Sequence, residues 1–151
     1  MKIKKKLQIG GKSMYVYLMK SPDGQLLIKK AYNPSDKAQL KRYKSEVKIM
    51  KHLEHCPFVP KLVFSRDDKC VIWMTYVGSP LKNIPKDKND LADQMKQLHL
   101  EWNVMRHRNG VPNYSVFIGN GTRLNGTVYV IDFGSYHYKI VGPKKMEKIV
   151  Q

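Results

Sequence analysis

The sequence has no apolar run long enough to cross a membrane, and it has few cysteines. A transmembrane helix needs about 20 consecutive apolar residues, and no stretch of this chain approaches that length. The basic start at 1–6 lacks the apolar segment and the small-residue cleavage site of a secretory signal. Cys56 and Cys70 are too few for a disulfide framework. We therefore expect a cytoplasmic protein with reduced thiols and no membrane partner.

Acidic residues are also scarce. The chain of 151 residues has 28 Lys and Arg against 12 Asp and Glu, so its formal net charge is +16 with the histidines neutral. A surplus of this size favours an anionic partner, which includes an acidic protein surface, a phosphorylated ligand and a nucleic acid. With 42% hydrophobic and 10% aromatic residues the chain is too apolar to be disordered, and its length suits one ordinary domain.

Hydrophobic periodicity in the first half predicts strands followed by a helix. The helix is expected over 36–54, where Asp36 and Gln39 form a capping box at its start. Its apolar stripe consists of Leu40, Tyr43, Val47, Met50 and Leu53. The expected strands lie near 5–9, at 14–19 and at 26–29, and turn-forming residues at 21–24 join the last two into a hairpin.

The second half is predicted to mix strands and loops with one further helix. That helix is expected over about 90–102, after a polar linker at 82–88. Residues 104–113 are expected to form a loop. The predicted strands lie at 61–66, 70–76, 114–118 and 127–132.

Residues 10–13 read Gly-Gly-Lys-Ser and match the end of the phosphate-binding P-loop pattern. The glycine that opens this pattern would fall at Lys6, and the loop should lead into a helix, whereas 14–19 has strand composition. We therefore interpret these glycines as a turn between two strands.

Four short motifs follow one another along the chain with strands or a helix between them. A strand ends in Leu26-Leu27-Ile28-Lys29, Glu46 lies on the helix that follows, 72–77 reads Ile-Trp-Met-Thr-Tyr-Val, and the sequence Asp-Phe-Gly follows the last predicted strand at 132–134. Together these motifs resemble the third-strand lysine, the helix C glutamate, the fifth strand with its hinge and the Asp-Phe-Gly motif of the protein-kinase-like superfamily. The resemblance extends over nearly the whole chain.

This resemblance implies an α+β fold with a hinge near 76–80. Residues 1–77 would form a kinase-like N-lobe, in which a five-stranded antiparallel sheet packs against helix C. Residues 78–151 would form a strongly reduced C-lobe in the same compact unit. Because side chains alternate on a strand, Leu27, Lys29 and Ala31 are expected to share the inward face.

The resemblance also implies that the chain binds ATP with Mg²⁺. A nucleotide triphosphate needs a cation beside its phosphates, and Lys29 would supply it while Glu46 holds the lysine in place. Oxygen ligands for the metal would come from Asn113 and Asp132. The nucleotide-binding positions that the resemblance implies are Gly11, Lys29, Glu46, Met74 and Tyr76.

The sequence departs from the family where catalysis would need a base. Aligned on Asn113, the chain has Arg108 at the position of the catalytic aspartate, and aligned on His107-Arg108 it has Asn109 there. No Asp or Glu occurs between Glu101 and Asp132 to replace it. Of the glycines of the nucleotide-covering loop only Gly11 is present. The Asp-Phe-Gly motif is followed by 17 residues, whereas the family has an activation segment and helices that hold a peptide substrate there.

Three functions are compatible with these observations. We favour a pseudokinase that binds nucleotide and regulates a partner, which would be a kinase or another protein with an acidic surface. The first alternative is an active minimal phosphotransferase that uses ATP and Mg²⁺, with His107 as a substitute base. The second is a basic nucleic-acid-binding module on a kinase-like fold.

Overall fold

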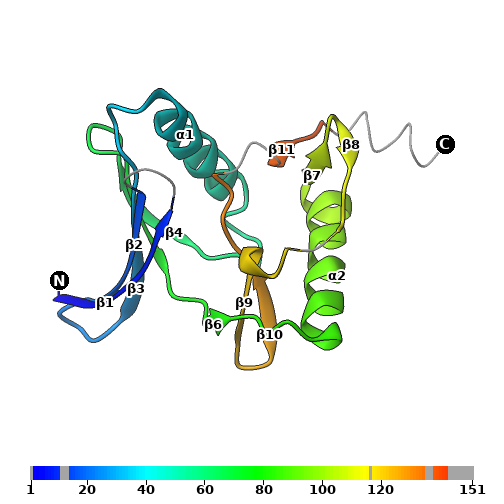
Figure 1. The fold of residues 1–151 in the computed structure, drawn as a ribbon, viewed down its shortest axis with the longest axis horizontal. Coiled ribbons are helices and arrows are strands. Elements are labelled where there is room, and N and C mark those ends of the chain that lie inside the picture. Colours follow the sequence, from blue (N-terminus) through cyan, green and yellow to red (C-terminus); the bar gives the residue numbers. More distant parts are fainter. Residues whose placement is uncertain (1, 11–13, 116, 135–137, 143–151) are drawn as a thin grey trace. The chain divides into compact units, whose positions relative to one another are not determined.

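The computed structural model describes residues 2–10, 14–115, 117–134 and 138–142 (Figure 1). The fold is α+β, as the sequence predicts, and two compact units can be separated by their internal contacts. Unit 1 comprises 1–54 and 60–76, whereas unit 2 comprises 55–59 and 77–151. None of the helices in the described ranges is both long enough and apolar enough to span a membrane.

Unit 1 is built on a five-stranded antiparallel sheet, which confirms the predicted sheet. Its strand order is β1-β2-β3-β5-β4, so that β3 and β5 are neighbours although a helix and a strand separate them in sequence. The turn between β2 and β3 is closed by a hydrogen bond from the backbone N–H of Gly24 to the carbonyl of Ser21. The strands are β1 (Lys2–Gly10), β2 (Met14–Lys20), β3 (Leu26–Ala31), β4 (Leu62–Arg66) and β5 (Val71–Thr75).

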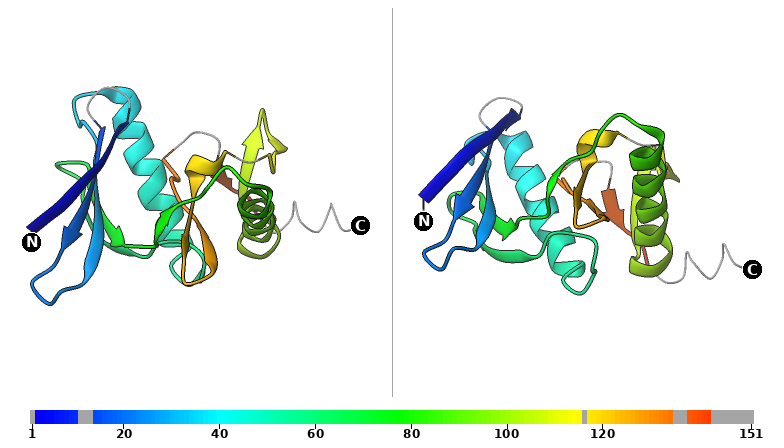
Figure 2. Two further views of the ribbon diagram at one scale, coloured as in Figure 1. Left: turned by 60° about the horizontal axis from the view of Figure 1, so that its bottom comes forward. Right: turned by 90° about the horizontal axis from the view of Figure 1, so that it is seen from below.

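The helix of unit 1, α1 (Lys37–His52), lies along one face of this sheet (Figure 2). Asp36 caps it as predicted, because its Oδ1 accepts the backbone N–H groups of Ala38 and Gln39 at 2.9 and 3.2 Å. The Gln39 half of the predicted capping box differs, because the Gln39 side chain accepts the N–H of Asn33 at 2.7 Å while the N–H of Asp36 donates to the Asn33 carbonyl at 3.2 Å. The predicted apolar stripe is buried at Tyr43, Val47, Met50 and Leu53, and Leu40 is half-buried.

The helix of unit 2, α2 (Pro85–Trp102), begins five residues before the predicted start. The polar segment at 82–88 is therefore not only a linker. Proline suits the first helical turn because its fixed φ is already helical and it lacks an N–H that would need a partner there. Buried Leu91, Met95 and Leu98 form the apolar face that packs on β7 and β10.

Unit 2 also contains two small three-stranded sheets, and here several predictions fail. No strand forms in the described part of 114–118, which ends in the 3-10 turn η1 (Ile118–Asn120). The loop predicted at 104–113 is a hairpin of β7 (Val104–Arg108) and β8 (Val111–Pro112). The remaining strands are β6 (Ser79–Pro80), β9 (Gly121–Leu124), β10 (Thr127–Val130) and β11 (Tyr138–Ile140).

Gly78, near the start of unit 2, lies close against the backbone of β9. Its φ is +101°, and a Cβ at this position would lie 2.1 Å from the carbonyl oxygen of Arg123. The neighbouring backbone is fixed by the Thr122 hydroxyl, which donates to the carbonyl of Val77 at 2.6 Å. Only glycine fits here without moving the β9 backbone.

We therefore predict that Gly78→Ala lowers the free energy of unfolding by at least about 2 kcal/mol, because backbone strain adds to a clash with backbone. Gly126→Ala is the matched control, since Gly126 also has positive φ (+83°) but nothing lies within 4 Å of its Cβ position. The control should lose only about 1 kcal/mol from strain alone. Urea unfolding measures both, and equal losses would contradict the close approach at Gly78.

Candidate functional site

A buried ion pair joins the sheet of unit 1 to its helix. Lys30 Nζ on β3 lies 3.0 Å from Glu46 Oε1 and 3.2 Å from Oε2 on α1. The two side chains are only 7% and 1% exposed. A buried charge is costly unless it is paired and hydrogen-bonded, so each of these residues requires the other.

Tyr32 completes the cluster around Glu46. Its hydroxyl donates to Glu46 Oε1 at 2.7 Å, and its ring lies 5.5 Å from Lys30 Nζ. On its other side the ring makes an edge contact with Tyr43, with centroids 6.2 Å apart. Lys30 and Tyr32 are two residues apart in an extended segment, so both project to the face that α1 covers.

The predicted pair of Lys29 and Glu46 is therefore wrong by one residue. Leu27 and Lys29 do share a face of the sheet, but it is the face away from α1. There Lys29 Nζ lies 5.2 Å from the ring centre of Trp73, which stacks on Phe64 at 5.5 Å. Two lysines follow one another in this strand, and its sequence does not state which of them points to the helix.

The other predicted nucleotide-binding residues are Met74, Tyr76 and Gly11. Met74 on β5 is buried and pairs with Ile28, so it shares the face of Lys30. Tyr76 is half-buried at the last residue of unit 1. Gly11 lies outside the described residues.

In unit 2 the segment that the sequence aligns with the catalytic loop of protein kinases forms the β7–β8 hairpin. Arg108 pairs with Val111, and the two residues between them, Asn109 and Gly110, have φ of +53° and +83°. An Asn-Gly dipeptide with two positive φ angles is typical of the tight two-residue hairpin turn. His107 Nδ1 accepts the N–H of Gly110 at 3.1 Å, so the histidine stabilises the turn.

Asp132 follows β10 by two residues. Its φ of +72° is unusual for a residue other than glycine. Burial raises the pKa of Tyr138, and the nearby groups that also act on it are the Arg106 guanidinium, which lowers it, and the Asp132 carboxylate, which raises it. Arg106 and Tyr138 are direct partners between β7 and β11. Unit 2 thus gathers Asp132, Arg106 and Tyr138.

Two buried donors of this group have no hydrogen-bond acceptor among the described residues. They are Arg106 Nε and the Tyr138 hydroxyl. Such atoms are rare in folded proteins, and an oxygen atom of a ligand or of water would satisfy them. Arg106 does use its Nη1, which donates to the Ser115 carbonyl at 3.0 Å.

The proposed metal ligands differ in how well they fit Mg²⁺. Asp132 suits the ion, because Mg²⁺ is usually held by one or two carboxylates together with substrate phosphates and water. Asn113 Oδ1 already accepts the N–H and the hydroxyl of Ser115 at 3.0 and 2.6 Å. It would have to release these bonds to bind a metal. In the described ranges no group of three or more His, Cys, Asp or Glu side chains could hold one.

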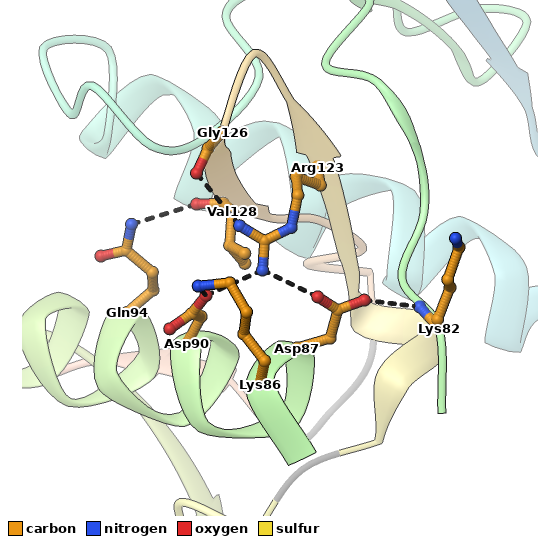
Figure 3. A network of polar contacts seen from close by, with 8 residues as sticks. All are labelled: Lys82, Lys86, Asp87, Asp90, Gln94, Arg123, Gly126 and Val128. Carbon is orange, nitrogen blue, oxygen red and sulfur yellow. Dashed lines mark hydrogen bonds and ion pairs between the residues drawn. The ribbon is translucent and has the colours of Figure 1, made fainter. Parts of the chain in front are cut away.

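An ion-pair network that sequence reasoning missed holds the hairpin before Asp132 against α2 (Figure 3). Arg123 Nη2 on β9 donates to Asp87 Oδ1 at 2.7 Å and to Asp90 Oδ2 at 2.8 Å. Arg123 Nη1 donates to the Gly126 carbonyl at 3.0 Å, and Lys86 lies 3.5 Å from Asp90. The spacing of Asp87 and Asp90 places both on one side of a helix, which is the only sequence signal for this network.

These partners stabilise the ionised aspartates. The backbone N–H of Lys82, with the Arg123 guanidinium, holds the pKa of Asp87 below its ordinary value of 3.8. Arg123, with Lys86, does the same to the pKa of Asp90. A carboxyl whose pKa is lowered on folding stabilises the fold above its unfolded pKa, and this contribution is lost as the pH falls.

Comparison of the chain with models of known protein families finds no match, and comparison with curated proteins finds none either. The geometry of the two units therefore carries the functional argument.

The Arg123 network predicts a pH-dependent effect of Arg123→Met. At pH 7 the variant should have a lower urea midpoint than the wild type, because Asp87 and Asp90 lose their cation. The difference should shrink as the pH falls through and below about 4, where both carboxyls become protonated.

Arg66→Met is the matched control, because Arg66 forms a 2.9 Å ion pair with Asp68 in which both side chains are more than half exposed. Exposed pairs contribute little, so the control should change the midpoint slightly at any pH. A difference between wild type and Arg123→Met that stayed constant down to pH 3 would contradict the role of the two aspartates.

Proposed function

We propose that the chain is a kinase-like nucleotide-binding protein, located in the cytoplasm, that acts as a pseudokinase and regulates a partner protein. The observation that carries this proposal is the buried pair of Lys30 and Glu46. A lysine on the third strand, held by a glutamate on the following helix, is the arrangement with which protein kinases place a cation beside the nucleotide phosphates. The cation in this chain is Lys30, one residue after the lysine that the motif comparison selects.

The burial of this pair favours a functional origin. Replacing a buried ion pair by apolar residues is often neutral or stabilising, so such a pair adds little to stability by itself. Here both carboxylate oxygens of Glu46 contact Lys30, and Oε1 also accepts the Tyr32 hydroxyl. Such a site orients one ammonium group firmly, which a phosphate-binding site requires.

Asp132 supplies the second element of the proposal. It follows a strand in an unusual backbone conformation, and its carboxylate raises the pKa of Tyr138, whose hydroxyl is one of the two orphaned donors. A carboxylate suits Mg²⁺, and the two donors suit a phosphate oxygen or the water around the ion. ATP with Mg²⁺ is therefore the proposed ligand.

The β7–β8 hairpin favours a regulator over a catalyst. It presents Arg108 and Asn109 where protein kinases have a catalytic carboxylate, and both are exposed. A missing base typically costs 10²–10⁴ in rate. A kinase, or another protein with an acidic surface, is the partner that suits a chain of net charge +16.

An active phosphotransferase is the second candidate, and the intact pair of Lys30 and Glu46 together with Asp132 favours it. Its base would be His107, whose Nδ1 is occupied by the Gly110 N–H. A proton would then have to be taken up at Nε2.

Thermal unfolding with and without ATP and Mg²⁺ tests nucleotide binding. A ligand at about 100 times its Kd stabilises the folded state by about 2.7 kcal/mol, and the wild type should show a corresponding shift in Tm. Lys30→Met should remove the shift. Lys29→Met has the same composition and net charge as Lys30→Met. It should retain the Tm shift, because Lys29 lies on the other face of the sheet.

The unliganded Tm of each variant establishes that it folds, and Lys30→Arg provides a variant that retains the charge. A shift that survives in Lys30→Met, or the absence of a shift in the wild type at millimolar ATP, would contradict nucleotide binding at this pair. If the wild type transfers phosphate from radiolabelled ATP and Asp132→Ala abolishes this transfer, the chain is a phosphotransferase and the pseudokinase proposal is wrong.

A further inference from the structure

We propose that a groove on α1 binds an acidic peptide segment of a partner protein that carries an aliphatic anchor residue. We call it the α1 groove. It is a concavity of about 370 Å³ between α1 and the turn that joins β4 to β5. Its lining residues are Leu40, Tyr43, Lys44, Val47, Lys48, Lys51 and Asp67.

The floor of the α1 groove is apolar. Leu40 is half-buried, and Tyr43 and Val47 are 2% and 8% exposed. The Tyr43 hydroxyl donates to Asp67 Oδ1 at 2.6 Å. Burial and the Asp67 carboxylate raise the pKa of Tyr43 to about 12, so the hydroxyl keeps its proton at neutral pH. The concavity of about 370 Å³ above this floor has space for an aliphatic side chain.

The rim of the α1 groove is cationic. Lys44, Lys48 and Lys51 follow one another at helical spacing, and all three are exposed. The acid that lines the groove, Asp67, accepts the Tyr43 hydroxyl. The lysines extend over two turns of α1, or about 10 Å. This length suits several acidic side chains of one peptide.

The charge of α1 has no compensation within the helix. Six of its residues are Lys or Arg, and its single acid, Glu46, is buried against Lys30. Like charges three or four residues apart destabilise a helix by a few tenths of a kcal/mol for each pair. An acidic partner on this face would offset the repulsion.

An acidic peptide fits the α1 groove better than a nucleic acid does. Binding of single strands relies on aromatic rings that stack with bases, and the ring that lines the groove, Tyr43, is 2% exposed and cannot stack with a base. A phosphate backbone would use the lysines and leave the apolar floor unfilled. A peptide with Asp or Glu beside Leu, Ile, Val or Met uses both.

This inference is independent of nucleotide binding, because Lys30, Glu46 and Tyr32 are not among the residues that line the groove. It gives the proposed partner surface a location. Failure of the ATP experiment would leave it unchanged, and its own failure would leave nucleotide binding unchanged.

The test is a selection of peptides from a displayed random library on the immobilised full chain, followed by fluorescence anisotropy with the enriched peptides. We expect the enriched sequences to combine acidic and aliphatic residues. The variant Lys44→Gln/Lys48→Gln/Lys51→Gln should weaken their binding about tenfold or more, because three ion pairs are lost. Leu40→Gln should weaken it as well, without changing the charge.

Lys2→Gln/Lys4→Gln/Lys5→Gln is the matched control. It removes the same charge from exposed residues of β1, and its affinity should stay within about twofold of the wild type, as expected for remote charges. Urea unfolding of each variant establishes that the fold is retained.

Three outcomes would overturn the proposal. The selection could enrich no acidic peptide, or the enriched peptides could bind the groove variant as tightly as the control. In the third, a labelled oligo-dT strand binds the wild type, displaces the peptides and loses affinity in the groove variant more than in the control. That result would make the partner of the α1 groove a nucleic acid.

Discussion

The ion pair of Lys30 and Glu46 is the constraint on which unit 1 depends. It connects the middle of a five-stranded sheet to the helix that covers it, and its charges have almost no contact with water. A buried pair of this kind requires one register of β3 against α1, because a slip of one residue would turn Lys30 to the far face of the sheet, away from Glu46, and would bring Leu27 and Lys29 to the helix instead. The same requirement places Tyr32 beside Glu46 and Tyr43 beside Tyr32.

The scarcity of acidic residues also determines where the positive charge of the chain is exposed. Several of the carboxylates stabilise a particular part of the fold, since Asp36 caps α1, Glu46 holds Lys30, Asp67 holds Tyr43, and Asp87 and Asp90 hold Arg123. Few remain to neutralise the surface lysines. The positive charge is therefore concentrated on exposed faces such as that of α1, where it is available to a partner.

Much of the fold of unit 1 could be predicted from the sequence, because the hydrophobic periodicity and the turn and cap residues indicate the same element boundaries. The strand segments of unit 1 are rich in apolar and aromatic residues and are bounded by turn formers. Asp36 is a favourable N-cap residue, and the apolar residues of α1 recur at steps of three and four. The failures lie where the signal was local and weak. The sequence predicts a loop around the Asn-Gly turn at 109–110, because the flanking strand residues Arg106, His107 and Arg108 show no apolar alternation.

The candidate site was predicted in part, for a related reason. Residue type and order select Glu46, which does hold a lysine of β3, but two adjacent lysines differ only in the direction of their side chains, which the packing of α1 decides. The network of Arg123 with Asp87 and Asp90 joins residues more than thirty positions apart. The spacing of the two aspartates places them on one side of a helix, but nothing in a single sequence indicates that Arg123 is their partner. The orphaned donors Arg106 Nε and Tyr138 Oη likewise become visible only when β7 and β11 are paired.

The most direct test of the account is a double-mutant cycle on Lys30 and Glu46, with unfolding free energies measured in urea for Lys30→Met, Glu46→Gln and the double variant. Residues in one buried ion pair should give a coupling energy of about 2–3 kcal/mol. The parallel cycle of Lys29→Met with Glu46→Gln should be additive within about 0.5 kcal/mol. Additivity at Lys30 together with coupling at Lys29 would contradict the register of β3, and with it the assignment of Lys30 as the cation of the site.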